Sequence, residues 1–305
     1  MRKAAIIILI FLLVSFLSAA EKEIKLDRTF NFEGVKRVKI DLKITNGKLR
    51  VYTWDKKEAK VEGIIKYRGE YPEVELRKSG DMLILRVEKE KKWFFFWHSS
   101  PGRKDLWADV TVFLPEPFEG KAGVVNGRVE LKSVVGKKNG YVKLSSVNGI
   151  VRVLELRSEE LKVSNVNGRI MISGTFAEEA SLGTVNGKIE ATGFFAAHLK
   201  AKTVNGDIEL DLEEKPLDKE GYWKISSVNG DIYLNFLDQP QFYYDFKIKS
   251  VSGNVYVQLS GVDISSTNVF SKASFELNEG KGAKAEIFVD INTVSGDVEV
   301  RRESK

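Results

Sequence analysis

The five residues Val166-Asn167-Gly168-Arg169-Ile170 are one copy of the motif that decides the fold. Val-Asn-Gly, then any residue, then Ile or Val occurs six times, and Ser replaces Asn in two later copies. The motif glycines are Gly127, Gly149, Gly168, Gly187, Gly206 and Gly230, followed by Gly253 and Gly296 in the Ser copies. Successive copies are mostly about 19 to 24 residues apart, a period typical of stacked β repeats. A looser copy covers residues 45–49.

The apolar residues of each repeat change phase at the motif. Leu161 and Val163 occupy odd positions, whereas Ile170 and Ile172 occupy even positions. Because strict alternation cannot change phase within one flat strand, each repeat is predicted to hold two strands joined by a corner. We expect an all-β fold, a β-solenoid with coils of about 19 to 24 residues. The alternative is a series of Asn-Gly hairpins in a β-sandwich or meander.

The two geometries place the motif side chains differently. In the solenoid geometry the corner comes just before Val, so that Val, Gly and Ile point inward while Asn points outward. In the hairpin geometry Val is on the surface, and the polar residue before it faces the core: Ser146, Asn165, Thr184, Thr203, Ser227, Ser250 or Thr293. Buried polar groups are costly, which favours the solenoid geometry. Its outward asparagines would stack as an amide ladder: Asn126, Asn148, Asn167, Asn186, Asn205 and Asn229.

Residues 1–20 have the pattern of a secretory signal peptide. Arg2 and Lys3 precede an apolar run, and Ser18-Ala19-Ala20 offers a cleavage site. An uncleaved N-terminal anchor is the alternative, because the run is near the minimum length that spans a bilayer. We therefore expect export, to the extracellular space or the cell envelope. Removal of residues 1–20 would take away Arg2 and Lys3 and lower the net charge from +5 to +3 (46 − 43), which is too small to indicate nucleic-acid binding.

Residues 21–120 are predicted to form an N-terminal β region that is continuous with the repeats of residues 121–305. One segment of it lacks alternation and is entirely aromatic: Trp93, Phe94, Phe95, Phe96 and Trp97. It is either an irregular plug of the core or an exposed tip that contacts a membrane or a partner. The second possibility makes it a candidate binding site.

These features resemble the "putative adhesin" family, a domain of unknown function in bacterial and archaeal envelope proteins. The resemblance rests on the exported N-terminus, the strand that ends at Pro115 and the serial Val-Asn-Gly repeats, and it covers about residues 35–300. It implies a β-solenoid fold and supplies no catalytic residues. The aromatic segment and the long interval before Gly296 depart from the family pattern.

Few residues suit catalysis or metal binding. There is no Cys, and His98 and His198 are the only histidines; we predict that His198 is packed in a turn. Asp207 and Asp231 would lie on adjacent coils, either as a solvated charged face or as a patch that binds a cation or hydrolyses glycosides. We expect no catalytic residue, metal site or cofactor.

The sequence therefore predicts a non-enzymatic envelope protein that binds through an extended solenoid face or has a structural role. Its partner would be an envelope polymer, a surface protein or a membrane interface. The alternatives are an accessory or sensor subunit of an envelope-stress system and a β-helix protein that binds or cleaves polysaccharides. The final coil, at Val300 and Arg301, would leave an open edge and permit end-to-end self-association.

Overall fold

The computed structural model describes residues 20–89, 106–134, 136–213, 220–236, 242–259, 262–266, 270–278 and 285–302, with the backbone alone for 262–266. Within these ranges all the regular secondary structure is β, so the protein has an all-β fold. The signal-peptide prediction falls on residues outside these ranges, apart from residue 20.

The strands of the N-terminal half are β1 (Lys22–Asn31), β2 (Val38–Trp54), β3 (Glu58–Tyr67), β4 (Glu73–Ser79), β5 (Met82–Glu88), β6 (Leu106–Pro115), β7 (Phe118–Lys132), β8 (Asn139–Leu154), β9 (Arg157–Ser164) and β10 (Asn167–Ser173). Those of the C-terminal half are β11 (Phe176–Gly183), β12 (Ile189–Lys202), β13 (Ile208–Leu212), β14 (Gly221–Asn229), β15 (Ile232–Phe236), β16 (Phe242–Ser252), β17 (Val255–Leu259), β18 (Val262–Ser266), β19 (Ser271–Leu277), β20 (Ala285–Ser295) and β21 (Val298–Arg302).

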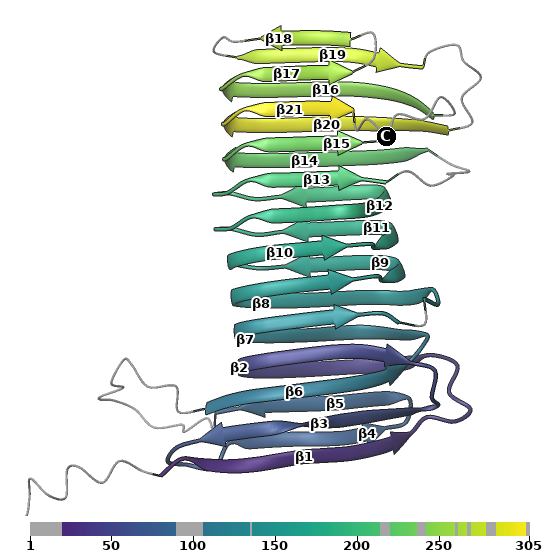
Figure 1. The fold of residues 1–305 in the computed structure, drawn as a ribbon, viewed down its shortest axis with the longest axis vertical. Coiled ribbons are helices and arrows are strands. Elements are labelled where there is room, and N and C mark those ends of the chain that lie inside the picture. Colours follow the sequence, from purple (N-terminus) through teal and green to yellow (C-terminus); the bar gives the residue numbers. More distant parts are fainter. Residues whose placement is uncertain are drawn as a thin grey trace, which may run out of the picture.

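Each repeat forms one layer with two legs that meet at the Val-Asn-Gly corner. In one layer, β9 precedes the corner and β10 follows it, and both pair in parallel with the equivalent legs of neighbouring layers. Asn167 and Gly168 lie opposite Asn148 and Gly149 in this register. The Asn-Gly pairs therefore do not close hairpins. Figure 1 shows the layers piled along the long axis of the molecule.

The legs form two ladders of hydrogen-bonded strands. The first ladder, made of the legs before each corner, has the order β4-β5-β2-β7-β8-β9-β11-β12-β14-β20-β16-β19. The second ladder, made mainly of the legs after each corner, has the order β1-β3-β6-β2-β7-β8-β10-β12-β13-β15-β21-β17-β18. The long strands β2, β7, β8 and β12 belong to both. Antiparallel strands finish both ladders at each end of the stack.

The C-terminal strands do not form the last layer. β20 lies between β14 and β16, and β21 lies between β15 and β17; in Figure 1 this yellow pair sits among green strands. The sequence-based expectation of an open edge at Val300 and Arg301 is therefore wrong, because β21 has a hydrogen-bonded neighbour on both sides. The layers are not stacked in chain order at this end.

The predicted inward orientation of the motif valine is wrong, whereas Asn167 is exposed and Ile170 is buried, as expected. Val166 and Val185 are 39% and 41% exposed, whereas the residues before them, Asn165 and Thr184, are 4% and 6% exposed. The core between the ladders is filled by the alternating apolar residues on either side of the corner, such as Leu161 and Ile170. The layers thus stack in parallel but place the motif side chains as the hairpin geometry had required.

Hydrogen bonds at the corner explain the burial of a polar residue before Val in five of the layers. Asn165 donates from Nδ2 to the carbonyl oxygen of Gly149 at 2.9 Å, and Thr203 donates to that of Gly187 at 3.2 Å. Ser227, Ser250 and Thr293 do the same to the corner glycine of an adjacent layer. A buried carbonyl without a partner costs about 1–3 kcal/mol, so these bonds offset the burial penalty that the sequence argument had counted against this arrangement.

Candidate functional site

The corner glycines place consecutive layers in very close backbone contact. Gly168 has a φ of 135°, a conformation that disfavours side chains. A Cβ atom added to it would lie 1.9 Å from the carbonyl oxygen of Gly149, and the same close approach recurs at the other corners. Glycine is therefore required here by the spacing of the layers.

The motif asparagines are joined in a continuous row along the outside of the corner. Each one donates from Nδ2 to Oδ1 of the asparagine in the preceding layer, at 2.7–2.9 Å. The row begins at Asn46, one layer earlier than the six asparagines singled out from the sequence. The loose copy at residues 45–49 was the signal that could have extended the prediction. We call this row, Asn46 to Asn229, the amide ladder.

The acidic pair Asp207 and Asp231 lies in adjacent layers, and a third carboxylate, Asp297, continues the row. Asp207 accepts the backbone N–H of Asp231 at 3.0 Å, and Asp231 accepts that of Asp297 at 2.8 Å. Asp297 in turn accepts the backbone N–H of Asn254 at 2.7 Å. Each carboxylate therefore holds the next layer. Among the described residues, no group of three or more His, Cys, Asp and Glu side chains is placed to hold a metal ion.

Tyr233 adds a further contact to this row. Its hydroxyl donates to Oδ2 of Asp231 at 3.3 Å, and partial burial together with the charge of Asp231 raises the pKa of the phenol. Both carboxylate oxygens of Asp231 therefore accept hydrogen bonds, Oδ1 from the backbone N–H of Asp297 and Oδ2 from Tyr233. The geometry fits a structural role for these carboxylates better than a reactive one.

Two other sequence predictions have different outcomes. His198 is not packed in a turn: it lies within strand β12, and its side chain is exposed. Strand alternation explains this, because the neighbouring Leu199 takes the buried position. The aromatic candidate site at Trp93 to Trp97 lies outside the described residues, between β5 and β6.

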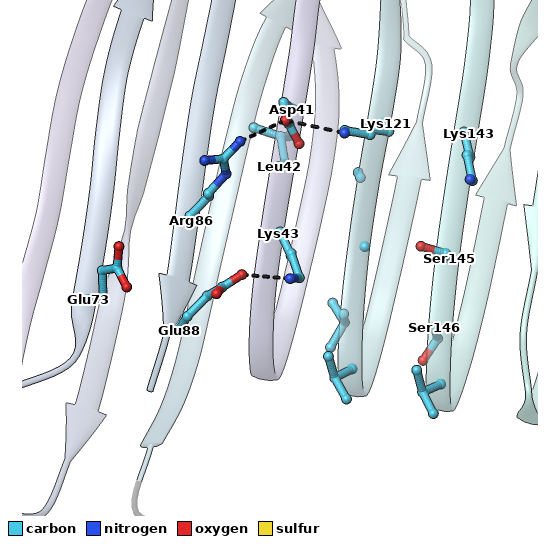
Figure 2. Close-up of a pocket in the computed structure, with 15 residues that line it drawn as sticks. Asp41, Leu42, Lys43, Glu73, Arg86, Glu88, Lys121, Lys143, Ser145 and Ser146 are labelled. Atoms are coloured by element: carbon cyan, nitrogen blue, oxygen red, sulfur yellow. Dashed lines mark hydrogen bonds and ion pairs between the residues drawn. The ribbon is translucent and has the colours of Figure 1, made fainter. Parts of the chain in front are cut away.

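A groove of about 760 Å³ crosses the outer face of the first ladder at β2, β7 and β8. Figure 2 shows its charged side chains on neighbouring strands. Asp41 pairs with Arg86 at 3.2 Å and with Lys121 at 3.4 Å, and Lys43 pairs with Glu88 at 2.6 Å. The hydrogen bond to Asp41 is the main cause that raises the pKa of Arg86.

The groove deepens because small residues interrupt the row of long side chains. Gly123 and Ser145 lie opposite each other on β7 and β8, between the charged end and Val147. Lys143 also lines the groove, and in Figure 2 it has no dashed contact to another lining residue. The groove therefore combines a cationic wall, a small polar floor and an apolar wall. The sequence reasoning missed it, although the period-two pattern could have placed these side chains on one face.

The chain is similar to a solved structure of a putative cell adhesion protein from Clostridium sporogenes, with 16% identity and a TM-score of 0.28, over 93% of this chain and 100% of that one. It is also similar to a putative adhesin from Bacteroides fragilis, with 14% identity and a TM-score of 0.41, over 92% of this chain and 98% of that one. A third similar structure is a putative lipid binding protein from Parabacteroides distasonis, with 10% identity and a TM-score of 0.36, over 93% of this chain and 97% of that one.

No curated protein matches the chain. Within the described residues, no helix has the length and apolar character needed to cross a membrane. The family described as Toastrack DUF4097 matches residues 29–301. That match covers most of the sequence, including most of the N-terminal β region and every copy of the Val-Asn-Gly motif. The protein is therefore a member of the Toastrack DUF4097 family.

Proposed function

We propose that the protein is an exported, non-enzymatic binding protein of the cell envelope, adhesin-like in character, whose layers act as a β-solenoid. The observation that carries the proposal is the repetition of identical exposed side chains along the corner. Val147, Val166, Val185, Val204 and Val228 are each about two-fifths exposed. They run beside the amide ladder, and stacked repeats typically bind through such extended surfaces.

The N-terminal sequence supports the envelope location. Residues 1–20 combine a basic start, an apolar run and small residues at a cleavage position, which is the pattern of an export signal. Fractionation of the producing cells tests this part of the proposal: the protein should be found in the envelope or medium. Recovery in the cytoplasm alone would contradict it.

The binding activity can be tested with an array of envelope glycans and with lipid vesicles of neutral and anionic composition. The matched variant changes Trp93, Phe95 and Trp97 to Ser. Binding that the variant loses would assign the contact to the aromatic segment, whereas binding that it retains would assign it to the stacked faces. Absence of binding to every glycan and vesicle would contradict the proposed function.

A further inference from the structure

From the groove at β7 and β8, a row of small outward residues continues across the same face to β11; we call this row and the groove the trough. Its floor positions are paired in register from layer to layer: Gly123 with Ser145, Ser145 with Ser164, and Ser164 with Gly183. Neighbouring strands are about 4.8 Å apart, so these four positions span about 15 Å along the stack. A Cβ atom added to Gly183 would meet nothing within 4 Å, which shows that the floor is still open there.

The trough has a cationic wall and an apolar wall. Lys121, Lys143 and Lys162 are paired in register along one side, and Lys200 follows after Ser181. Two residues further along each strand, on the other side of the floor, lies a row of valines that begins at the half-buried Val125 and continues with the exposed Val147. The small residues thus lie between two rows of larger ones, in a line that runs across the strands.

Both ends of the trough are closed by larger side chains. At the β2 end, the floor position opposite Gly123 is occupied by Lys43, which is held by its ion pair with Glu88. At the other end, the position opposite Gly183 is Lys202. The open floor is thus limited to four consecutive layers.

The cations of the wall differ in their pairing. At the ends of the row, Lys121 pairs with Asp41 at 3.4 Å and Lys224 pairs with Asp290 at 3.5 Å. Among the described carboxylates none comes within ion-pair distance of Lys143, Lys162 or Lys200. Of these, Lys143 and Lys162 lie beside the open floor, whereas Lys200 lies in the layer of Lys202. These two lysines are therefore available to an external anion, with a spacing set by the strands.

We infer that this trough binds an extended anionic polysaccharide whose chain runs along the stacking direction of the layers. The lysines would face its carboxylates, the serine hydroxyls its ring hydroxyls, and the valines its C–H faces. An acidic peptide fits less well, because an extended strand repeats its same-face side chains at about 6.6 Å rather than the 4.8 Å of the layers. The inference rests on the proposed binding function and names the ligand class for one surface.

Two variants test the inference with the full chain and polygalacturonate as the probe. Lys143→Glu with Lys162→Glu reverses the wall charge, and Gly183→Trp fills the floor at a position with open space. Each should weaken binding about tenfold or more, and binding by the unaltered protein should fall as salt rises. The control, Lys249→Glu with Lys272→Glu, makes the same charge change on the same ladder at β16 and β19 and should leave the affinity unchanged.

The outcomes separate this inference from the proposed function. Equal weakening by the control pair, equal affinity for poly-glutamate, or no binding of polygalacturonate would overturn the trough assignment. If the protein then still binds another glycan or a vesicle, and the trough variants leave that binding intact, the proposed function stands without the trough. Thermal melting of each variant confirms that a lost affinity does not reflect unfolding.

Discussion

Two regions of the stack hold their corners together with different hydrogen bonds. Along the amide ladder, from Asn46 to Asn229, one side-chain amide donates to the next. From Asp207 to Asn254, a carboxylate instead accepts the backbone N–H of the neighbouring layer. The two kinds overlap only in the layers that contain Asp207 and Asp231.

The difference follows from what each kind of bond requires of the neighbouring layer. The amide ladder needs an Asn in both layers. A carboxylate needs only a backbone N–H in the neighbouring layer, and every residue except Pro supplies one. Where β20 and β21 enter between earlier strands, the motif carries Ser252 and Ser295, and the carboxylate row spans the junction. Both kinds of bond join layers that are close in sequence and layers that are distant: Asn126 bonds to Asn46 across 80 residues, and Asp297 bonds to Asp231 across 66 residues. The comparison indicates that the side chains present at the corner, and not the separation along the chain, decide which bond forms.

The largest effect is expected at a corner glycine. Gly168→Ala would place a methyl group 1.9 Å from the Gly149 carbonyl oxygen at a φ of 135°, which should destabilise the protein by about 3 kcal/mol or more. Gly183→Ala is the control, since its Cβ meets nothing within 4 Å. Urea unfolding measures both, and equal stability of the two variants would contradict the close contact of the layers.

Removal of a carboxylate should be next in size. Asp231→Ala leaves the backbone N–H of Asp297 without its acceptor, at a cost of about 1–3 kcal/mol. Asp231→Asn keeps an acceptor oxygen and should retain most of the stability. If Ala and Asn at this position give the same midpoint in urea, the hydrogen bond does not hold the junction.

The amide ladder should show a dependence on position. Asn167→Ala removes one donated and one accepted bond and should cost about 1 kcal/mol. Asn46 lies at the end of the ladder, where it accepts a bond from Asn126, so Asn46→Ala should cost less. Thermal melting compares the two, and a larger loss at the end position would argue against the ladder.

The smallest difference is expected among the buried hydroxyl groups. Thr203→Val removes the bond to the Gly187 carbonyl and should cost about 1 kcal/mol. The Thr184 hydroxyl is buried without a partner, so Thr184→Val should be neutral or slightly stabilising. Equal destabilisation of the two variants in urea would show that burial, and not the corner bond, sets the stability.

Much of the architecture could be predicted from the repeat. The phase change between Val163 and Ile170 correctly indicated two strands per layer, because alternation is a local property of the chain. The orientation of Val166 could not be derived in the same way, since it depends on the bond from Asn165 to the glycine of another layer. The local sequence pattern shows the cost of burying Asn165, but it does not show the hydrogen bond to another layer that offsets this cost.

The stacking order and the trough could not be predicted from the sequence either, because both depend on which strands pair and in which register. The sequence near Asp297 does not indicate that its layer lies next to the layer of Asp231 rather than at the end of the stack. The reason is that a strand's own sequence pattern does not specify which layer it pairs with. The trough depends on the register between strands, which puts Ser145 beside Ser164. Once the register is known, the alternation of each strand does place these residues on the outer face.

The order of the layers is tested most directly by disulfide cross-linking, which is simple in a chain without cysteine. Asn229 lies opposite Ser295, which in turn lies opposite Ser252. Cysteines at 229 and 295 should therefore form a disulfide in the folded protein under mild oxidation. Those at 229 and 252, two layers or about 9.6 Å apart, should not, because the distance exceeds the reach of the bond. A cross-link between 229 and 252, with none between 229 and 295, would contradict the interleaved stack.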